Sequence, residues 1–410
     1  MNLAGYIARK VAFNASKSFS RFIIRLAVAA TTISVMAMII AMAFTNGFQY
    51  VISQKIFNFW GHIRVQHYEP SKALIAEEYP IEKNDTVRDL VRSVPGIASI
   101  QPFATRNAIL KTTETIEGVL FKGIEKTYDT GRLTSFLKEG RWMKYPDSGY
   151  SNDIVLSAYT AKQLNLKVND PVLIYFIQND GSPPRARKLT ISGIYKTGIE
   201  EYDKLIALGD IRLVQRLNNW PENQIGGYEI ILSDYKQIDT LNETIFSKLP
   251  VLWNSRTIKE IYPNIFDWLG LQDKTIAIVL IIMIIVAVLN LITCLIILVL
   301  ERTRMVGILK ALGAYNGTIQ RIFLYHGAFI TLVGISLGNI LAFTIIFLQK
   351  KYSLIRLPEE MYYIDKAEVL VIPWQVIAVN LGTFIICMLV LLIPTLIIRK
   401  IQPVKAIQFK

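Results

Sequence analysis

Side chains that commonly carry out catalysis are few in this sequence, and their spacing does not suggest an active site. His62 and His67 are five residues apart in an expected strand, on opposite faces, so they are poorly placed to share a metal ion. His326 stands near the start of a long apolar segment, where a structural role is expected. The acid pairs Glu200–Glu201 and Glu359–Glu360 are expected to be solvated. The sequence has no Gly-Lys dipeptide and hence no P-loop, so we predict no catalytic residue, no metal site and no cofactor in this chain.

A charged, amphipathic segment is the strongest candidate for a binding function. Residues 301–321 read ERTRMVGILKALGAYNGTIQR. The apolar residues follow the i, i+3, i+4, i+7 spacing of one helix face, and they are Met305, Ile308, Leu309 and Leu312. The charged start offers charge-assisted hydrogen bonds, and Gly313 supplies a helix stop. Such a helix could bind a groove on a partner protein or lie on a membrane surface.

Four long apolar stretches must position that segment. They contain 23, 26, 27 and 27 residues and cover residues 22–44, 275–300, 322–348 and 372–398. Each exceeds the roughly 20 residues that cross a bilayer as a helix. Apolar residues make up 52% of the 410-residue chain, charged residues make up 19%, and the mean hydropathy is +0.35. These values exclude a soluble enzyme and a disordered chain.

The net charge of +13 is concentrated around the apolar stretches. Within residues 1–47, 275–348 and 371–410 the single acid is Glu301, while basic residues cluster at the ends of the stretches. The positive-inside rule therefore places these regions and both termini on the cytoplasmic side. Residues 48–274 and the short 349–371 loop are then outside, and the excess of charge does not indicate a nucleic-acid partner.

We predict a membrane protein with four transmembrane α-helices and a large α+β domain inserted between helix 1 and helix 2. An apolar core longer than the 7–15 residues of a cleaved signal makes the first helix an uncleaved anchor. The expected segments are a cytoplasmic amphipathic N-terminal segment (1–21), transmembrane helix 1 (22–47), the outer domain (48–274), transmembrane helix 2 (275–300), a cytoplasmic helix (301–321), transmembrane helix 3 (322–348), a short outer loop (349–371), transmembrane helix 4 (372–398) and a cytoplasmic tail (399–410).

The outer domain contains strand and helix patterns of ordinary globular sequence. Residues 171–177 form an apolar run of strand length, and residues 188–195 alternate as in a half-buried strand. The turn-rich residues 178–187 between them predict a hairpin with a protruding tip. Further strands are expected at 207–208 and 228–232, and short helices at 86–93, 157–164 and 210–217.

An ordered set of motifs resembles a known family. Residues 301–314, ERTRMVGILKALGA, are similar to the signature of the FtsX-like permeases of ABC transporters. The glycines Gly327, Gly334 and Gly338 and the closing Arg399 and Pro403–Ala406 fit the same family, although Lys405 replaces its usual acid. Other motifs resemble one branch, the Lol lipoprotein-releasing permeases, and they are Asn46-Gly47-Phe48, Gly61–Val65, Asn290, Leu357–Tyr363 and Pro373-Trp374.

The resemblance implies the MacB/FtsX-like permease architecture and a subunit without enzymatic activity in the bacterial inner membrane. Its partners would be a cytosolic ABC ATPase dimer that binds ATP and Mg, a second permease protomer (identical or paralogous), lipoprotein cargo and a periplasmic lipoprotein carrier. The ATPase-coupling residues would be Glu301, Arg302, Arg304, Met305, Gly307, Ile308, Leu309, Lys310, Leu312 and Gly313.

Three further sites are expected. Gly327, Gly334 and Gly338 would allow close helix packing, and Asn290, Asn339 and Asn380 should form hydrogen bonds between helices. In the Lol branch a lipid cavity lies between spans one and two, where the candidates are Met36, Met38, Met42, Phe44 and Val279, although a packing role for these methionines is as plausible. The hairpin tip occupies the place of the carrier-docking hook, with Pro183, Pro184, Arg185 and Arg187 as candidates, although an exposed hairpin needs no function.

Two alternatives remain open at this stage. A MacB-type exporter permease would drive its substrate from the periplasm towards an outer-membrane duct. An FtsX-type transducer would instead activate a periplasmic cell-wall hydrolase. The first normally carries a fused ATPase, and the second usually has a smaller outer domain and lacks the 357–363 motif.

Overall fold

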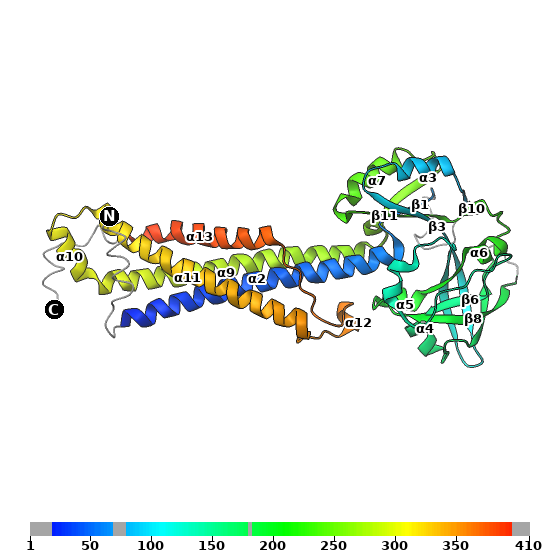
Figure 1. Cartoon of the computed structure of the whole chain (residues 1–410), viewed down its shortest axis with the longest axis horizontal. Coiled ribbons are helices and arrows are strands. Elements are labelled where there is room, and N and C mark those ends of the chain that lie inside the picture. The colour runs from blue at the N-terminus through cyan, green and yellow to red at the C-terminus, as the bar shows by residue number, and fades with distance from the viewer. Residues whose placement is uncertain (1–18, 69–78, 179–182, 396–410) are drawn as a thin grey trace. The chain divides into compact units, whose positions relative to one another are not determined.

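The computed structural model describes residues 19–68, 79–178 and 183–395, which form two units (Figure 1). We call them the helical unit (19–50, 268–356 and 366–395) and the sheet unit (51–68, 79–178, 183–267 and 357–365). The helices α2 (Phe19–Trp60) and α9 (Pro263–Glu301) each contribute residues to both units. The predicted fold class, four apolar helices and an inserted α+β domain, is confirmed.

Among the residues that the structure describes, four helices are long and apolar enough to cross a membrane. They are α2, α9, α11 (Asn316–Tyr352) and α13 (Pro373–Thr395), and the short α10 (Thr303–Ala311) lies between α9 and α11 in the chain. With 42 and 39 residues, α2 and α9 are about 60 Å long, roughly twice the thickness of the hydrocarbon layer.

α2 continues well beyond the apolar stretch that predicts it. Phe48, Ile52 and Ile56 recur every four residues and are buried, so a helical stripe extends to Trp60 even though polar residues lie between them. Gly61, with a φ of +76°, then ends the helix. A search for uninterrupted hydrophobicity ends too early here because the second half of α2 is amphipathic.

Glycines set the distance between α11 and α2. A Cβ atom on Gly334 would lie 2.7 Å from the Cβ of Thr31, and one on Gly338 would lie 2.9 Å from the carbonyl oxygen of Thr32. The Thr32 hydroxyl donates a hydrogen bond to the Gly334 carbonyl at 3.3 Å. Side chains larger than hydrogen at these two positions would therefore separate the helices.

Polar side chains join α11 to α13, and Gln49 of α2 donates hydrogen bonds to the Leu269 carbonyl and the Asp273 carboxylate of α9 at 3.0 and 2.9 Å. Asn339 and Asn380 exchange two amide hydrogen bonds of 2.9 and 3.0 Å. The same bond expected for Asn290 does not form with any residue that the structure describes, where its side-chain nitrogen is buried without a partner. Gly327 faces α13 at Leu391, the side chain that a Cβ atom would meet.

Gly47 admits the backbone that precedes α13. A Cβ atom here would overlap the Glu368 carbonyl and lie 2.8 Å from the Cα of Val369. The Leu370 amide donates a 2.8 Å hydrogen bond to the Ala43 carbonyl of α2. Phe48 packs edge-to-face on Trp268, with ring centroids 5.4 Å apart. The Asn46-Gly47-Phe48 motif is thus a packing motif of the helical unit.

The sheet unit is built on a mixed sheet of ten strands ordered β12-β1-β11-β3-β4-β9-β6-β8-β5, in which β7 pairs with β3 and β8. The pairs β4–β9 and β6–β8 are parallel, and the other pairs are antiparallel. The strands are β1 (Ile63–His67), β3 (Ile97–Lys111), β4 (Ile116–Ile124), β5 (Leu137–Gly140), β6 (Asp153–Ser157), β7 (Pro171–Phe176), β8 (Arg185–Tyr195), β9 (Ile206–Asp210), β11 (Gly227–Leu232) and β12 (Trp253–Thr257), with β2 (Ile81–Glu82) and β10 (Gln224–Ile225) forming a separate pair.

Pairing of β7 with both β3 and β8 closes part of this sheet into a ring that runs β3-β4-β9-β6-β8-β7. Phe121 and Phe176 lie in its core, edge-to-face at 5.4 Å. The predicted hairpin is confirmed as β7 and β8. The helices of the unit are α3 (Asp85–Arg92), α4 (Ala158–Gln163), α5 (Glu200–Leu205), α6 (Ile211–Leu217), α7 (Ile238–Phe246), α8 (Ile258–Ile261) and α12 (Glu359–Tyr362).

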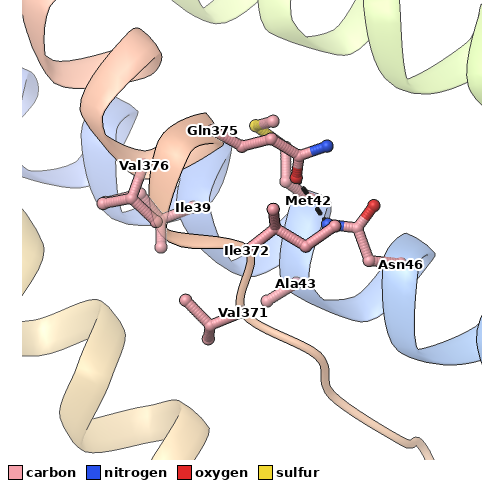
Figure 2. A pocket seen from close by; sticks show the side chains of 8 residues that line it. All are labelled: Ile39, Met42, Ala43, Asn46, Val371, Ile372, Gln375 and Val376. Atoms are coloured by element: carbon pink, nitrogen blue, oxygen red, sulfur yellow. Dashed lines mark hydrogen bonds between the residues drawn. The ribbon is translucent and has the colours of Figure 1, made fainter.

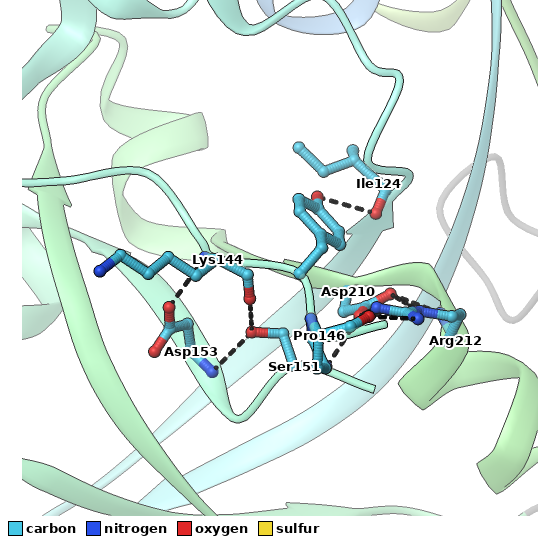
Figure 3. Close-up of polar contacts among 8 residues, drawn as sticks. Ile124, Lys144, Pro146, Ser151, Asp153, Asp210 and Arg212 are labelled. Carbon is cyan, nitrogen blue, oxygen red and sulfur yellow. Dashed lines mark hydrogen bonds and ion pairs between the residues drawn. The ribbon is translucent and has the colours of Figure 1, made fainter. Parts of the chain in front are cut away.

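Asp210 fastens the 144–153 segment to this ring (Figure 3). Its buried carboxylate accepts the Ser151 amide at 2.8 Å and pairs with the Arg212 guanidinium at 2.9 Å. The same side chain caps the start of α6 by accepting the Arg212 amide. Nearby, the Ser151 hydroxyl donates to the Lys144 carbonyl. The Asp210 carboxylate thus connects the 144–153 segment to the start of α6.

A buried ion pair holds the end of α2 in the sheet unit. Lys122 on β4 and Glu229 on β11 are 2.6 Å apart, and both side chains are 1% exposed. The Lys122 ammonium also donates to the Phe59 carbonyl at 2.9 Å, and the Tyr128 hydroxyl donates to Glu229 at 2.7 Å. The Lys122 ammonium lies 4.4 Å from the Trp60 ring centre. One cation therefore fixes two strands and the last turn of α2.

We expect Lys122→Met to destabilise the sheet unit strongly, because it leaves the Glu229 carboxylate buried without its cation. Removing one partner of a buried pair costs about 3–5 kcal/mol. Thermal unfolding of the detergent-solubilised chain, followed by near-ultraviolet circular dichroism, measures the effect. The control is Lys138→Met at an exposed lysine of β5. Equal unfolding temperatures for the two variants would contradict the anchoring role.

Two glycine-to-alanine changes in long helices should affect the free energy of unfolding differently. Gly47→Ala should cost about 1–3 kcal/mol, because the new methyl group overlaps the Glu368 backbone. Gly270→Ala, where the added atom meets nothing within 4 Å, should be neutral or stabilising by up to about 1 kcal/mol. The same unfolding assay compares them, and a Gly47→Ala protein as stable as Gly270→Ala would refute the close approach.

Candidate functional site

The segment expected to form the coupling helix is divided among three helices. α9 runs to Glu301, α10 covers Thr303–Ala311, and α11 begins at Asn316. The break after α10 has a clear cause, since Gly313 has a φ of +87° and the Gly313 and Ala314 amides bond back to carbonyls of α10. The result is one short helix followed by a tight turn.

The predicted apolar face of α10 is shared between the interior and the surface. Met305 and Leu309 pack against the core of the helical unit, in which Val306 is fully buried. Ile308 is 46% exposed and Leu312 is 79% exposed. Tyr315, 84% exposed, adds a residue that the helical spacing does not identify because it lies in the turn after Gly313. These three apolar side chains, Ile308, Leu312 and Tyr315, are named the α10 patch below.

Four charged side chains lie in the same stretch of the sequence as the α10 patch. Glu301 and Arg304 are exposed, whereas Arg302 and Lys310 are half-buried. Gly307 is buried among packed residues, and Gly313 is exposed at the turn. Exposed apolar side chains together with exposed charged ones are suited to docking a partner protein.

A small cavity lies between α2 and the start of α13 (Figure 2). It measures about 10 Å³, which is room for roughly one water molecule. Asn46 donates a 2.6 Å hydrogen bond to Gln375 at its wall. The apolar lining consists of Ile39, Met42, Ala43, Val371, Ile372 and Val376. An acyl chain does not fit in the cavity in this conformation.

The five residues expected at a lipid cavity are not gathered at one place. Met42 lines the cavity. Met38 is fully buried in a core cluster of the helical unit, and Met36 packs against that cluster. Phe44 on α2 and Val279 on α9 are half-buried. The cavity borders α13 rather than α9 because the Leu370–Ala43 hydrogen bond brings the chain before α13 to α2.

The expected ten-residue hairpin tip is shorter than predicted. Arg185 and Arg187 belong to β8, where they pair with Phe176 and Ile174 of β7. Arg185 is also occupied, since its guanidinium donates to the Leu217 carbonyl at the end of α6 at 2.9 Å. Pro183 and Pro184 are exposed, and residues 179–182 lie outside the described residues. The basic edge expected at the tip is thus partly used within the domain.

Comparisons with known proteins agree with this architecture. The FtsX-like permease C-terminal model matches residues 277–403, and the MacB-like periplasmic core domain model matches residues 26–245. The lipoprotein-releasing system transmembrane protein LolC of Neisseria meningitidis serogroup B is 25% identical over 369 residues, covering 85% of this chain and 84% of that protein. The protein LolE of Haemophilus influenzae is 26% identical over 363 residues, covering 83% of this chain and 85% of that protein.

Among solved structures, the periplasmic region of MacB from Actinobacillus actinomycetemcomitans aligns with a TM-score of 0.34 and 15% identity, covering 50% of this chain and 91% of that one. The assignment itself rests on the two family models, of which the MacB-like one spans more than half of the sequence. The chain therefore belongs to the FtsX-like permeases that carry a MacB-like periplasmic core domain.

Proposed function

We propose that this chain is the permease subunit of an ATP-driven complex that releases lipoproteins from the outer leaflet of the bacterial inner membrane. The observation that carries the proposal is the extent of the similarity. Relatives named as lipoprotein-releasing transmembrane proteins align over more than four fifths of both chains. Both the helical unit and the sheet unit fall within the matched families.

A separate cytosolic ATPase dimer would bind ATP and Mg and dock on the α10 patch. The patch presents Ile308, Leu312 and Tyr315 around a helix whose other side packs into the helical unit through Val306. Force applied to α10 would therefore reach α9 and α11, with which α10 shares a core cluster. This arrangement supports coupling by movement of helices, without chemistry in the permease.

Cargo and carrier would engage the opposite side of the membrane. The apolar cavity at Met42 supports an acyl-chain site that opens during the cycle, with a second permease protomer, identical or paralogous, completing it. The β7–β8 hairpin would present its tip to the periplasmic carrier, with Pro183 and Pro184 stiffening the loop. Cytoplasmic termini and a periplasmic sheet unit follow from the charge distribution.

Replacing Leu312 by aspartate should weaken ATPase binding by roughly 10- to 100-fold. A leucine that becomes buried when the ATPase binds would contribute about 1.5–3 kcal/mol to the interface. Leu312 is preferred over Leu309, whose packing against the core would make an acidic variant unstable. The control is Leu354→Asp, at a leucine that is 67% exposed just after α11. Affinity for the ATPase is measured with the permease in nanodiscs, and unchanged affinity for Leu312→Asp would remove the patch from the interface.

A photocrosslinker at Met42 should capture acylated lipoprotein in the assembled complex, and one at Val279 tests the α9 side. The control position is Leu289 on α9, 57% exposed and apolar, where only phospholipid should be captured. Mass spectrometry identifies the adducts. Phospholipid alone at both Met42 and Val279 would contradict the cargo site, and a captured non-acylated substrate would favour the exporter alternative.

A further inference from the structure

The middle of the loop between α11 and α13 belongs to the sheet unit. Residues 357–365 group with that unit, although the flanking helices belong to the helical unit. The loop contains α12 and is closed at its base by a 3.0 Å hydrogen bond from the Leu357 amide to the Asp365 carbonyl. Tyr363 ends α12 with a φ of +59°. The segment is therefore ordered as a compact turn.

Glu359 connects this loop to two lysines from different elements. Its carboxylate pairs with Lys196, which follows β8, and lies 4.0 Å from the ammonium of Lys55 on α2. Lys55 donates a further 2.7 Å hydrogen bond to the Tyr363 carbonyl. The Glu359 side chain is only 26% exposed. Two cations and one acid thus converge on α12.

Hydrogen bonds within the sheet unit hold the surface on which this loop lies. The Asp203 carboxylate accepts the Thr197 amide at 2.9 Å, the Thr197 hydroxyl at 2.8 Å and the Gly198 amide at 3.0 Å. Gly198 has a φ of +77°, and a Cβ atom on it would overlap the Glu359 carboxylate and lie 2.9 Å from the Lys55 ammonium. The turn therefore leaves open the space that the Glu359 side chain occupies.

A second contact lies on α5. The Tyr363 hydroxyl donates to the Glu201 carboxylate at 3.2 Å. Burial, followed by the Glu201 charge, raises the pKa of Tyr363, so the hydroxyl remains a neutral donor at physiological pH. Glu359 and Tyr363 thus dock opposite ends of α12 on one surface formed by α5 and the turn before it.

We propose that residues 357–365 form a latch that ties α11 and α13 to the periplasmic domain, with Glu359 and Tyr363 as positioning residues for transport. α2 and α9 enter the sheet unit as continuous helices, whereas α11 ends at Tyr352 and α13 begins at Pro373. The latch gives movement of these two spans a route to the domain in addition to their packing on α2. Its consequence for transport rests on the proposed function, but the docking itself does not.

The test uses the complete permease–ATPase complex in nanodiscs with the variant Glu359→Gln. Hydrogen exchange of the amides in residues 357–365 should become about three- to tenfold faster, because a charge-assisted contact is lost. Lipoprotein released per ATP hydrolysed should fall by a similar factor while ATP hydrolysis continues. The matched control is Glu368→Gln, which breaks a 3.0 Å pair with Lys366 outside the sheet unit and should change neither quantity.

A double variant separates the ion pair from a general effect of either change. The double variant Lys196→Met and Glu359→Gln should raise the exchange rate of residues 357–365 no more than Glu359→Gln alone, because both changes remove the same ion pair. Unchanged exchange in Glu359→Gln would overturn the latch, and faster exchange with normal release per ATP would overturn its role in transport. If the unmodified complex releases no lipoprotein, the proposed function fails while the exchange measurement still decides the docking.

Discussion

The buried ammonium group of Lys122 holds the last turn of α2 in the sheet unit. Taking the Lys122 ammonium out of water is costly unless every one of its protons meets an acceptor or an aromatic face. Glu229, the Phe59 carbonyl and the Trp60 ring meet that need, and they come from β11 and α2. The guanidinium of Arg64 lies in the same way between the rings of Trp60 and Phe103, at 4.6 and 4.5 Å. Directional contacts of this kind hold one register of the helix end, which apolar contacts alone would not.

The fixed end of α2 makes the packing along the rest of this helix important. A helix that is fixed at its end and packed along its length can transmit displacement, provided that its neighbours do not slide. On α2 the neighbours are kept close by Gly334, Gly338 and the backbone admitted at Gly47. Short polar contacts and glycines thus add to the apolar core clusters that hold the helical unit together.

The sequence predicts the class of this fold because hydropathy and charge are properties of long segments. The four spans, the inserted domain and the β7–β8 hairpin depend on such local patterns. Helix ends are different, since the extension of α2 past Gly47 depends on an amphipathic stripe that is buried by residues distant in the sequence. The pairing of β7 with β3 joins residues that no local pattern connects. The division of the α10 face between Leu309 and Leu312 depends on neighbouring helices for the same reason. Contacts distant in sequence are the part that a single sequence does not reveal.

The closed ring of strands also has an evolutionary consequence. The strand β7 is paired with β3 on one side and with β8 on the other, and β8 is also paired with β6. The registers of β7 and β8 are therefore set independently of the loop that joins them. Lengthening a surface loop costs little, about 0.6 kcal/mol for each doubling. The 177–184 connection is therefore a place where related permeases can differ in length and chemistry without disturbing the scaffold.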